Sequence, residues 1–473
     1  MTFIRNVHRV ALQAAACAAV QMFDQTAAIA AATADEARQL GSTLTEFGAE
    51  KAGNKDGSIP AYTGGLASVP GYDPKTMAQY LDPFKDDKPA FSVDGKNAAQ
   101  YDALLMAGTK AMLKQYPTFR LDVHQTRRSS RYPGWVLQNT VKNATTAKLA
   151  GEVEGDALSG ADTGNVPFAG IPFPIPKTGY EVLWNHHAHY SAAVSHNVGQ
   201  GYLIDTAGKT IELPGVNTYF LHPWYDKNNK LRGQTFDALF GFSATLTSPP
   251  SQAGVVFLSY YTANAADRGQ RTWFYTPGQR RVRLAPEFSY DVPIAGYGGV
   301  TVWDDIYGYL GRMDRFDFKL AGKKELLVPY NVFGVTNTMA VKDFIGPKHV
   351  NPEAVRWERR RVWVVEGTRK PDARHIYSRR TFYVEEDCWC IVASEAYDNS
   401  GALWRATNYY GFPTYDTGGF NTDSWSTNDI IKGNYFVLNV GHKEPGNLVR
   451  SYDTAEGLPI ALTPQAVAAT GVR

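Results

Sequence analysis

Apolar and polar residues alternate along most of the chain between residues 197 and 445. This period of two predicts β-strands, because successive side chains of a strand point to opposite faces. The clearest predicted strands, each bounded by turn-forming residues, are 255–261, 272–276, 281–284, 362–366, 376–385 and 391–397. The second and third of these flank a short turn and predict a hairpin, in which Arg281 and Arg283 share one face and Val282 and Leu284 the other. A long meander of this kind predicts a highly curved antiparallel sheet or a half-open β-barrel over residues 197–445.

Helical periodicity is found before this strand-rich region. Residues 97–116 predict a helical segment that is broken into two helices near Gly108 and Thr109. A further helix is expected to begin at Pro133, because proline is favoured in the first helical turn. Its apolar face is predicted to carry Leu137, Val141, Ala144 and Ala147.

Three alternate prolines in residues 171–176 predict a stiff extended strap, because they cannot donate backbone hydrogen bonds to a central strand. A short helix is predicted over 178–191. We therefore expect residues 97–196 to form helices and a proline-rich strap that pack on the sheet. The fold class is mainly β with helices (α+β), in which the curved sheet wraps a few helices.

The two ends of the chain lack the patterns of the central region. Residues 1–32 have the arginines, apolar run and alanine-rich cleavage candidates of a cleavable signal peptide, which predicts a periplasmic protein. Acylation of Cys17, which would make an outer-membrane lipoprotein, is the alternative. Residues 33–96 are predicted to be an extended N-terminal arm, and residues 446–473 a loosely ordered tail.

Composition excludes several classes of partner and site. The formal net charge is only +2, which gives no electrostatic footprint for nucleic acid. Beyond Cys17 the chain has Cys388 and Cys390, which we interpret as two small packed residues on one face of a strand. No cofactor is expected.

A search for catalytic signatures finds none that is complete, so we expect no enzyme, no catalytic residue and no metal. His186 and His189 would share a helix face and are the best candidates for metal ligation or for an acid/base pair. The acidic pairs Asp304-Asp305 and Glu385-Glu386-Asp387 are interpreted as surface charge, as are the arginine clusters. These clusters are Arg127-Arg128, Arg280-Arg281, Arg359-Arg360-Arg361 and Arg379-Arg380.

The feature that remains is the density of large aromatic residues, which could line a concave apolar surface. The predicted ligand-binding residues are Phe173, Trp184, His187, Trp273, Tyr275, Trp363 and Tyr377. Packing of each side chain in the protein core is the alternative interpretation.

Several stretches of the chain resemble one bacterial family, the domain of unknown function numbered 1329. The matching stretches are residues 44–66, 171–190, 273–286 and 361–386, followed by Tyr397-Asp398 and Leu403-Trp404-Arg405. The resemblance implies a fold similar to periplasmic lipoprotein carriers and outer-membrane lipoprotein receptors, which hold acyl chains in a half-open sheet. It also implies an envelope transporter or an outer-membrane protein as partner. His189 stands where the family more often has arginine, and the two late cysteines replace polar positions.

These observations favour a periplasmic protein that binds or carries a lipid-like or other hydrophobic ligand, in envelope lipid traffic. One alternative is an exported hydrolase that uses His186 and His189. A second is a non-catalytic adaptor of an envelope transporter, which would make its contact through residues 33–66. A continuous apolar cleft of several hundred Å³ would favour the carrier, and a filled interior would favour the adaptor.

Overall fold

The structure is a computed structural model that describes residues 32–265, 269–294 and 296–470. The predicted signal peptide and Cys17 lie almost wholly outside these residues. None of the helices within the described ranges is both long and apolar enough to span a membrane.

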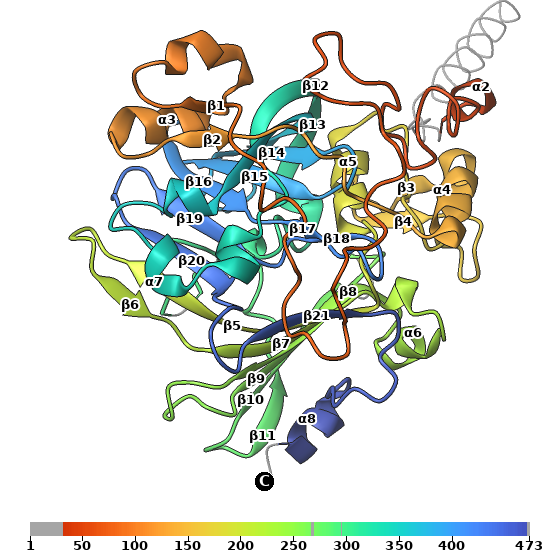
Figure 1. The fold of residues 1–473 in the computed structure, drawn as a ribbon. Coiled ribbons are helices and arrows are strands. Elements are labelled where there is room, and N and C mark those ends of the chain that lie inside the picture. The colour runs from red at the N-terminus through yellow and green to blue at the C-terminus, as the bar shows by residue number, and fades with distance from the viewer. Residues whose placement is uncertain (1–31, 266–268, 295, 471–473) are drawn as a thin grey trace, which may run out of the picture.

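Most strands of the described chain belong to one large sheet, which is dominated by antiparallel pairs and is not closed into a barrel (Figure 1). One half of this sheet follows the order β11 (Arg281–Leu284), β10 (Gln270–Thr276), β9 (Val256–Thr262), β8 (Ala238–Leu246), β7 (Val216–Leu221) and β5 (Val194–Ile204). The other half continues through β20 (Tyr435–Val440), β19 (Trp425–Asp429), β16 (Leu403–Tyr409), β15 (Ile391–Tyr397), β14 (Arg379–Glu385), β13 (Arg356–Arg369) and β12 (Phe316–Pro329). The predicted fold class is therefore confirmed.

Strand β5 joins the two halves because it is long enough to pair differently along its length. Its first residues pair with β7 on one side and with β21 (Leu448–Tyr452) on the other. Its last residues pair with β20 and with β6 (Thr210–Glu212). Short pairs complete the described strands: β1 (Phe91–Val93) with β2 (Leu121–Val123), β3 (Lys148–Ala150) with β4 (Ala157–Ser159), and β17 (Phe412–Pro413) with β18 (Phe420–Asn421).

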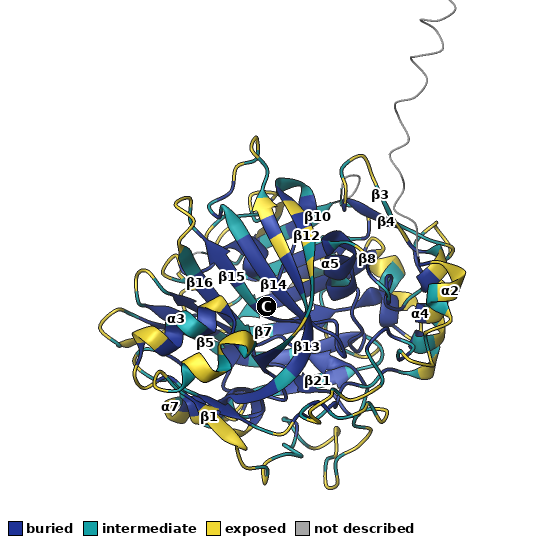
Figure 2. Ribbon diagram, turned by 90° about the horizontal axis from the view of Figure 1, so that it is seen from above, coloured by how far each residue is buried: buried dark blue, intermediate teal, exposed yellow. Residues whose placement is uncertain are grey.

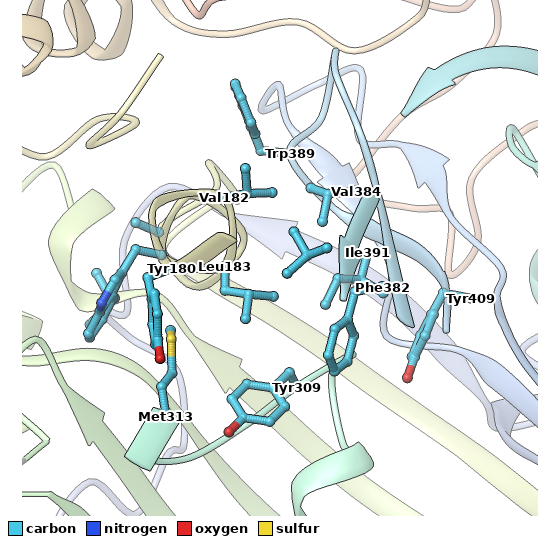
Figure 3. Close-up of a cluster of buried hydrophobic side chains, with 14 of the residues drawn as sticks. Tyr180, Val182, Leu183, Tyr309, Met313, Phe382, Val384, Trp389, Ile391 and Tyr409 are labelled. Carbon is cyan, nitrogen blue, oxygen red and sulfur yellow. The ribbon is translucent and has the colours of Figure 1, made fainter. Parts of the chain in front are cut away.

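Helix α5 (Gly179–His187) packs against β12 and β13, and Figure 3 shows its side chains within a cluster of buried apolar residues. The helix begins at Thr178, whose side chain accepts a hydrogen bond from the backbone of Glu181, while the Glu181 carboxylate accepts one in return. Eight of its nine residues are buried, and Leu183 packs with Ile391 and Phe382 of the sheet. The hydrophobic core that contains α5 is therefore built around this helix.

The other helices are peripheral, and Figure 2 shows exposed residues mainly on them and on the loops. The longer ones are α3 (Ala107–Gln115), α4 (Gly134–Thr146) and the 3-10 helix Ala98–Leu104; the shorter ones are α2 (Ala34–Ala37), α6 (Lys230–Gln234), α7 (Val341–Phe344) and α8 (Pro464–Thr470). Single turns are Pro223–Tyr225, Trp303–Asp305, Met313–Arg315 and Pro352–Ala354, with a π turn at Gly334–Thr338.

Several local predictions were wrong. The break in the first helical segment falls at Leu105 and Met106, just before Gly108. Helix α4 buries Val136, Thr140, Asn143 and Ala144, whereas the predicted face residue Val141 is exposed. The reason is that Thr140 and Asn143 make hydrogen bonds to the backbone of residues 168–171, so the buried face is partly polar.

The two ends of the described chain are also more ordered than their composition indicates. The tail contributes β21 to the sheet, and residues 458–467 pack on one face of β9, β10 and β11. In the N-terminal segment, Phe47 and Ala49 are fully buried in the main core. The backbone of Gly48 lies so close to Pro174 of the proline-rich strap that a side chain there would overlap its carbonyl oxygen.

Candidate functional site

A cleft of about 820 Å³ opens between three loops at the edge of the β8–β9 hairpin. We call it the loop cleft; its lining residues are Leu158, Asp162, Thr163, Gly164, Asn165, Val166, Asn229, Arg232, Gly233, Phe236, Asp237, Thr262, Ala263 and Asn264. Both polar and apolar residues line it, so it suits an amphipathic molecule better than a purely apolar one.

The backbone of the loop cleft is unusual. Asn165, Asn229, Phe236 and Asp237 all have φ between 50° and 58°, a left-handed conformation that residues with a side chain rarely adopt. Ten described non-glycine residues share this property, and four of them line this one cleft. Such conformations cost about 1–3 kcal/mol each and concentrate at functional sites, where the surrounding structure holds them.

Phe236 connects the loop cleft to the aromatic residues of the sheet. Its ring, 37% exposed, stacks on Trp273 at 5.5 Å between centroids, and Arg271 lies over it at 5.5 Å. Trp273 in turn contacts Tyr260 edge-on. The predicted ligand-binding residue Trp273 therefore lies beside the cleft, behind a partly exposed phenylalanine that the sequence pattern did not single out.

A second, much smaller space lies next to the loop cleft, and Thr262 lines both. We call it the aromatic pocket; it is lined mainly by Trp184, His187, Leu239, Phe240, Tyr261, Tyr307 and Leu310. Its volume of about 30 Å³ is room for one or two water molecules. The structure thus brings together two predicted ligand-binding residues, Trp184 and His187, around a pocket that is nearly filled.

The remaining predicted ligand-binding residues are spread over separate parts of the core. Phe173 is buried, and its backbone is held by both amide atoms of Asn185. Tyr275 is buried in the cluster under the C-terminal tail. Trp363 is half-buried and stacks on Trp389 at 6.2 Å, while Tyr377 is fully buried. Whether any of these contacts a ligand stays a prediction.

A chain of hydrogen bonds between buried imidazoles and one phenol runs behind the aromatic pocket. The Tyr307 hydroxyl lies 2.9 Å from Nε2 of His189 and 3.0 Å from Nε2 of His222. His186 donates from Nε2 to the Tyr307 carbonyl oxygen and accepts at Nδ1 from the Ile391 amide, so backbone groups occupy both of its ring nitrogens. Burial lowers the pKa of His222 to about 3 and that of His186 well below its usual value.

The two late cysteines lie next to this chain, in the turn between β14 and β15 and not on a strand. Both are buried free thiols, and the Cys390 amide donates to Sγ of Cys388. Burial works to raise the pKa of Cys390, but the Cys388 side chain and the nearby His189 outweigh it and bring that pKa to about 6. The same contact with Cys390 raises the pKa of His189 despite its burial.

Both acidic clusters are buried, and every arginine cluster except Arg280-Arg281 contains a buried member, so the interpretation as surface charge was wrong for all of them except Arg280-Arg281. One set, which we call the arginine–carboxylate network, contains Arg128, Arg360, Arg361, Glu385, Glu386 and Asp387. The side chains of Arg360 and Asp387 are 1% and 0% exposed, and their ion pair measures 2.6 Å. A second set joins Asp304 and Asp305 to Arg380, with His375 bound to Asp304 at 3.0 Å. Of the arginine clusters, Arg280-Arg281 alone is exposed at both residues.

These charges have partners from distant parts of the chain, which is why they can be buried. Arg128, before α4, meets Asp387 259 residues later, at 2.6 Å. In the part of the chain that the structure describes, no group of three or more histidine, cysteine, aspartate or glutamate residues is arranged to hold a metal ion. In both networks each buried carboxylate faces at least one arginine, which is the arrangement of a structural core, although Asp304 Oδ1 and Arg380 Nη1 of the second set make no hydrogen bond.

The sequence was compared with known proteins. The family model described as "Protein of unknown function (DUF1329)" matches residues 92–468. The chain belongs to the DUF1329 family. It is also 36% identical over 458 residues to the uncharacterized protein PA3922 of Pseudomonas aeruginosa, covering 95% of this chain and 96% of that one. The resemblance inferred from the sequence is therefore confirmed.

Three solved structures were compared with this DUF1329 chain. A DUF1329 family protein from Desulfovibrio piger is 16% identical and has a TM-score of 0.37, with 59% of this chain and 93% of that one covered. A putative outer membrane lipoprotein-sorting protein domain from Vibrio parahaemolyticus is 13% identical, with a TM-score of 0.40 and coverage of 61% and 97%. The LolA superfamily protein NE2245 from Nitrosomonas europaea is 12% identical, with a TM-score of 0.33 and coverage of 55% and 90%.

Proposed function

We propose that this protein is an exported, periplasmic binding protein that carries a lipid-like or other hydrophobic ligand in envelope lipid traffic, and that it is not an enzyme. The observation that carries the proposal is the loop cleft, whose volume of about 820 Å³ falls within the usual size range of small-molecule sites. The predicted signal peptide supports the compartment.

The ligand would bind in the loop cleft and not inside the curved sheet. Helix α5 and its core neighbours pack against the sheet, so buried side chains fill the space beside this helix. The polar part of an amphipathic ligand would lie near Arg232, Asp162 and Asn229. Its apolar part would lie on Leu158, Val166 and Phe236, with the aromatic pocket as an extension if Leu239 and Trp184 move apart.

A substitution at Gly233 tests this proposal. A β-carbon at Gly233 would meet nothing within 4 Å, and the residue lines the loop cleft, so Gly233→Trp should fill the cleft without disturbing the fold. Gly134→Trp is the matched control, because that glycine begins helix α4, is equally unobstructed and lies outside the cleft.

Native mass spectrometry of protein purified from its own periplasm should detect a bound apolar molecule, and titration with a fluorescent fatty acid should give saturable binding. Gly233→Trp should weaken that binding by at least about tenfold, and Gly134→Trp should not change it. Absence of any bound apolar molecule together with absence of fatty-acid uptake would refute the carrier. Equal binding by the two variants would refute the location.

The contacts of the two histidines do not favour the hydrolase alternative. His186 and His189 are buried, and all four of their ring nitrogens bind backbone groups or the Tyr307 hydroxyl, which leaves no position for a substrate. The adaptor alternative is favoured by the filled interior. A pull-down with and without residues 33–66 would separate it from the carrier.

A further inference from the structure

The outer edge of strand β11 is the open end of the large sheet. Strand β11 pairs with β10, and no other described strand pairs with it. In Figure 1 the β9–β10–β11 end projects away from the rest of the molecule, close to the described C-terminal end. An unpaired strand edge presents free N–H and C=O groups and is a template for one more strand.

The hydrogen-bond pattern of the hairpin identifies which residues face this edge. The Ala285 amide donates to the Thr272 carbonyl oxygen, and the register pairs Phe274 with Arg283. Because hydrogen-bonded and non-hydrogen-bonded pairs alternate in an antiparallel ladder, Arg283 also bonds toward β10. The N–H and C=O groups of Val282 and Leu284 therefore point outward to the open edge.

The side chains of β11 make one face of this edge positively charged and the other face apolar. Arg281 and Arg283 are exposed on one face, and no carboxylate of the described residues forms an ion pair with either of them. Arg283 lies over the ring of Phe274 at 5.7 Å, which fixes its position on that face. On the other face Leu284 is 56% exposed, whereas Val282 is half-buried because the C-terminal segment with α8 packs on that face of β11.

We propose that this edge binds an extended acidic segment of a partner protein, which adds to the sheet as a strand next to β11. The segment would alternate acidic and apolar side chains. Its acidic residues would lie beside Arg281 and Arg283, and its apolar residues beside Val282 and Leu284. Its backbone would complete the hydrogen bonds of Val282 and Leu284, which is the mode of recognition by strand addition.

Charge complementarity favours this occupant over a second copy of the chain. Two β11 edges paired antiparallel about a two-fold axis would bring Arg281 and Arg283 of one copy against the arginines of the other. Like charges directly opposite each other on a sheet are destabilising. An acidic strand removes that repulsion and neutralises two arginines that form no ion pair with the described residues.

The test uses the full mature chain and a labelled synthetic peptide of alternating glutamate and valine, with fluorescence anisotropy as the readout. A lysine–valine peptide is the control for charge. A glutamate–valine peptide N-methylated at every second residue, on the N–H groups that would face β11, is the control for backbone pairing. We expect the unmodified acidic peptide to bind at least about tenfold more tightly than either control at low ionic strength.

Protein variants give the reciprocal test. Arg281→Glu with Arg283→Glu should reverse the preference, so that the lysine–valine peptide binds and the glutamate–valine peptide does not. Val282→Pro should abolish binding without unfolding the hairpin, because its N–H is not part of the β10 ladder. Arg374→Glu is the matched control, since Arg374 is also exposed and lies on a different loop.

Three results would overturn the proposal. If the N-methylated acidic peptide bound as tightly as the unmodified one, attraction between charges alone would explain the binding and no strand would be added to the sheet. An equal loss of binding in the Arg374→Glu variant would show that the site is not β11. Failure of the wild-type chain to bind the acidic peptide, together with dimerisation of an Arg281→Ser, Arg283→Ser variant in analytical ultracentrifugation, would show that the arginines serve only to prevent self-pairing.

Discussion

Replacement of Arg360 by methionine should destabilise the protein more than any single change on its surface. Arg360 is 1% exposed and forms ion pairs with Glu385 at 2.7 Å and with Asp387 at 2.6 Å. It also lies 3.9 Å from the ring centre of Tyr330. Arg360 also pairs with the buried Glu358 at 3.4 Å. Methionine is similar in length and apolar, so the substitution removes the positive charge that compensates these three buried carboxylates.

The expected cost is about 3–5 kcal/mol of unfolding free energy, the range found when one member of a buried ion pair is removed. Arg359 is the internal control, because it precedes Arg360 on the same strand and points to the opposite face. Its side chain is 25% exposed and pairs with Asp56, which is 56% exposed, and with Glu325, which is 27% exposed, so both of its ion pairs are reached by solvent. Arg359→Met should therefore cost no more than about 1 kcal/mol.

Urea unfolding followed by circular dichroism would measure both variants at pH 7. The cost of Arg360→Met should fall at acid pH, where Glu385 and Asp387 become protonated and no longer need a positive partner. An equal cost for the two variants, or a cost of Arg360→Met that does not change with pH, would refute the assignment of Arg360 as the compensating charge of this network.

Two further changes test the electrostatics and the N-terminal segment. Burial raises the pKa of Asp423 from 3.8 to about 6, so the folded protein favours the protonated carboxyl. Its full contribution to the free energy of unfolding is therefore present below about pH 4 and is lost as the pH rises through about 6. Asp423→Asn should therefore gain about 3 kcal/mol relative to wild type between pH 4 and pH 7 in urea unfolding, and parallel pH profiles would contradict this. Gly48→Ala should release the N-terminal segment to limited proteolysis, because its β-carbon would lie 1.8 Å from the Pro174 oxygen. Gly64→Ala, with a similar φ and nothing within 4 Å, should leave the digestion pattern unchanged.

The strands could be predicted from the sequence because their signal is local. Strands 281–284 and 391–397 were predicted with the observed bounds, and the β10–β11 hairpin was expected from its turn. Alternation depends only on neighbouring residues, and one wet face is enough to produce it. The capping box at Thr178 likewise marks a helix start within four residues of sequence.

The fate of the charged residues could not be predicted in the same way. Net charge and clusters of like charge describe the composition of a segment, whereas burial depends on a partner that arrives from elsewhere in the fold. Glu385, Glu386 and Asp387 look like a solvated turn until Arg128 and Arg360 are brought to them. The loop cleft could not be predicted from the sequence for a related reason. Its lining residues come from three separate segments of the chain. The left-handed φ of Phe236 is a backbone property that the pattern of apolar and polar residues does not reveal.

The β14–β15 turn also decides what the N-terminal segment can do. Trp389 in this turn donates to the Phe47 carbonyl oxygen at 2.8 Å, and Arg128 donates to the Glu50 carbonyl oxygen at 2.8 Å while bound to Asp387. Residues 47–50 are thus held by the same network whose loss should destabilise the fold. An adaptor that released its arm to reach a partner would have to break these buried contacts. The exposed arginines of β11 can be reached without that cost, so a docking partner meets less resistance at the sheet edge than at the arm.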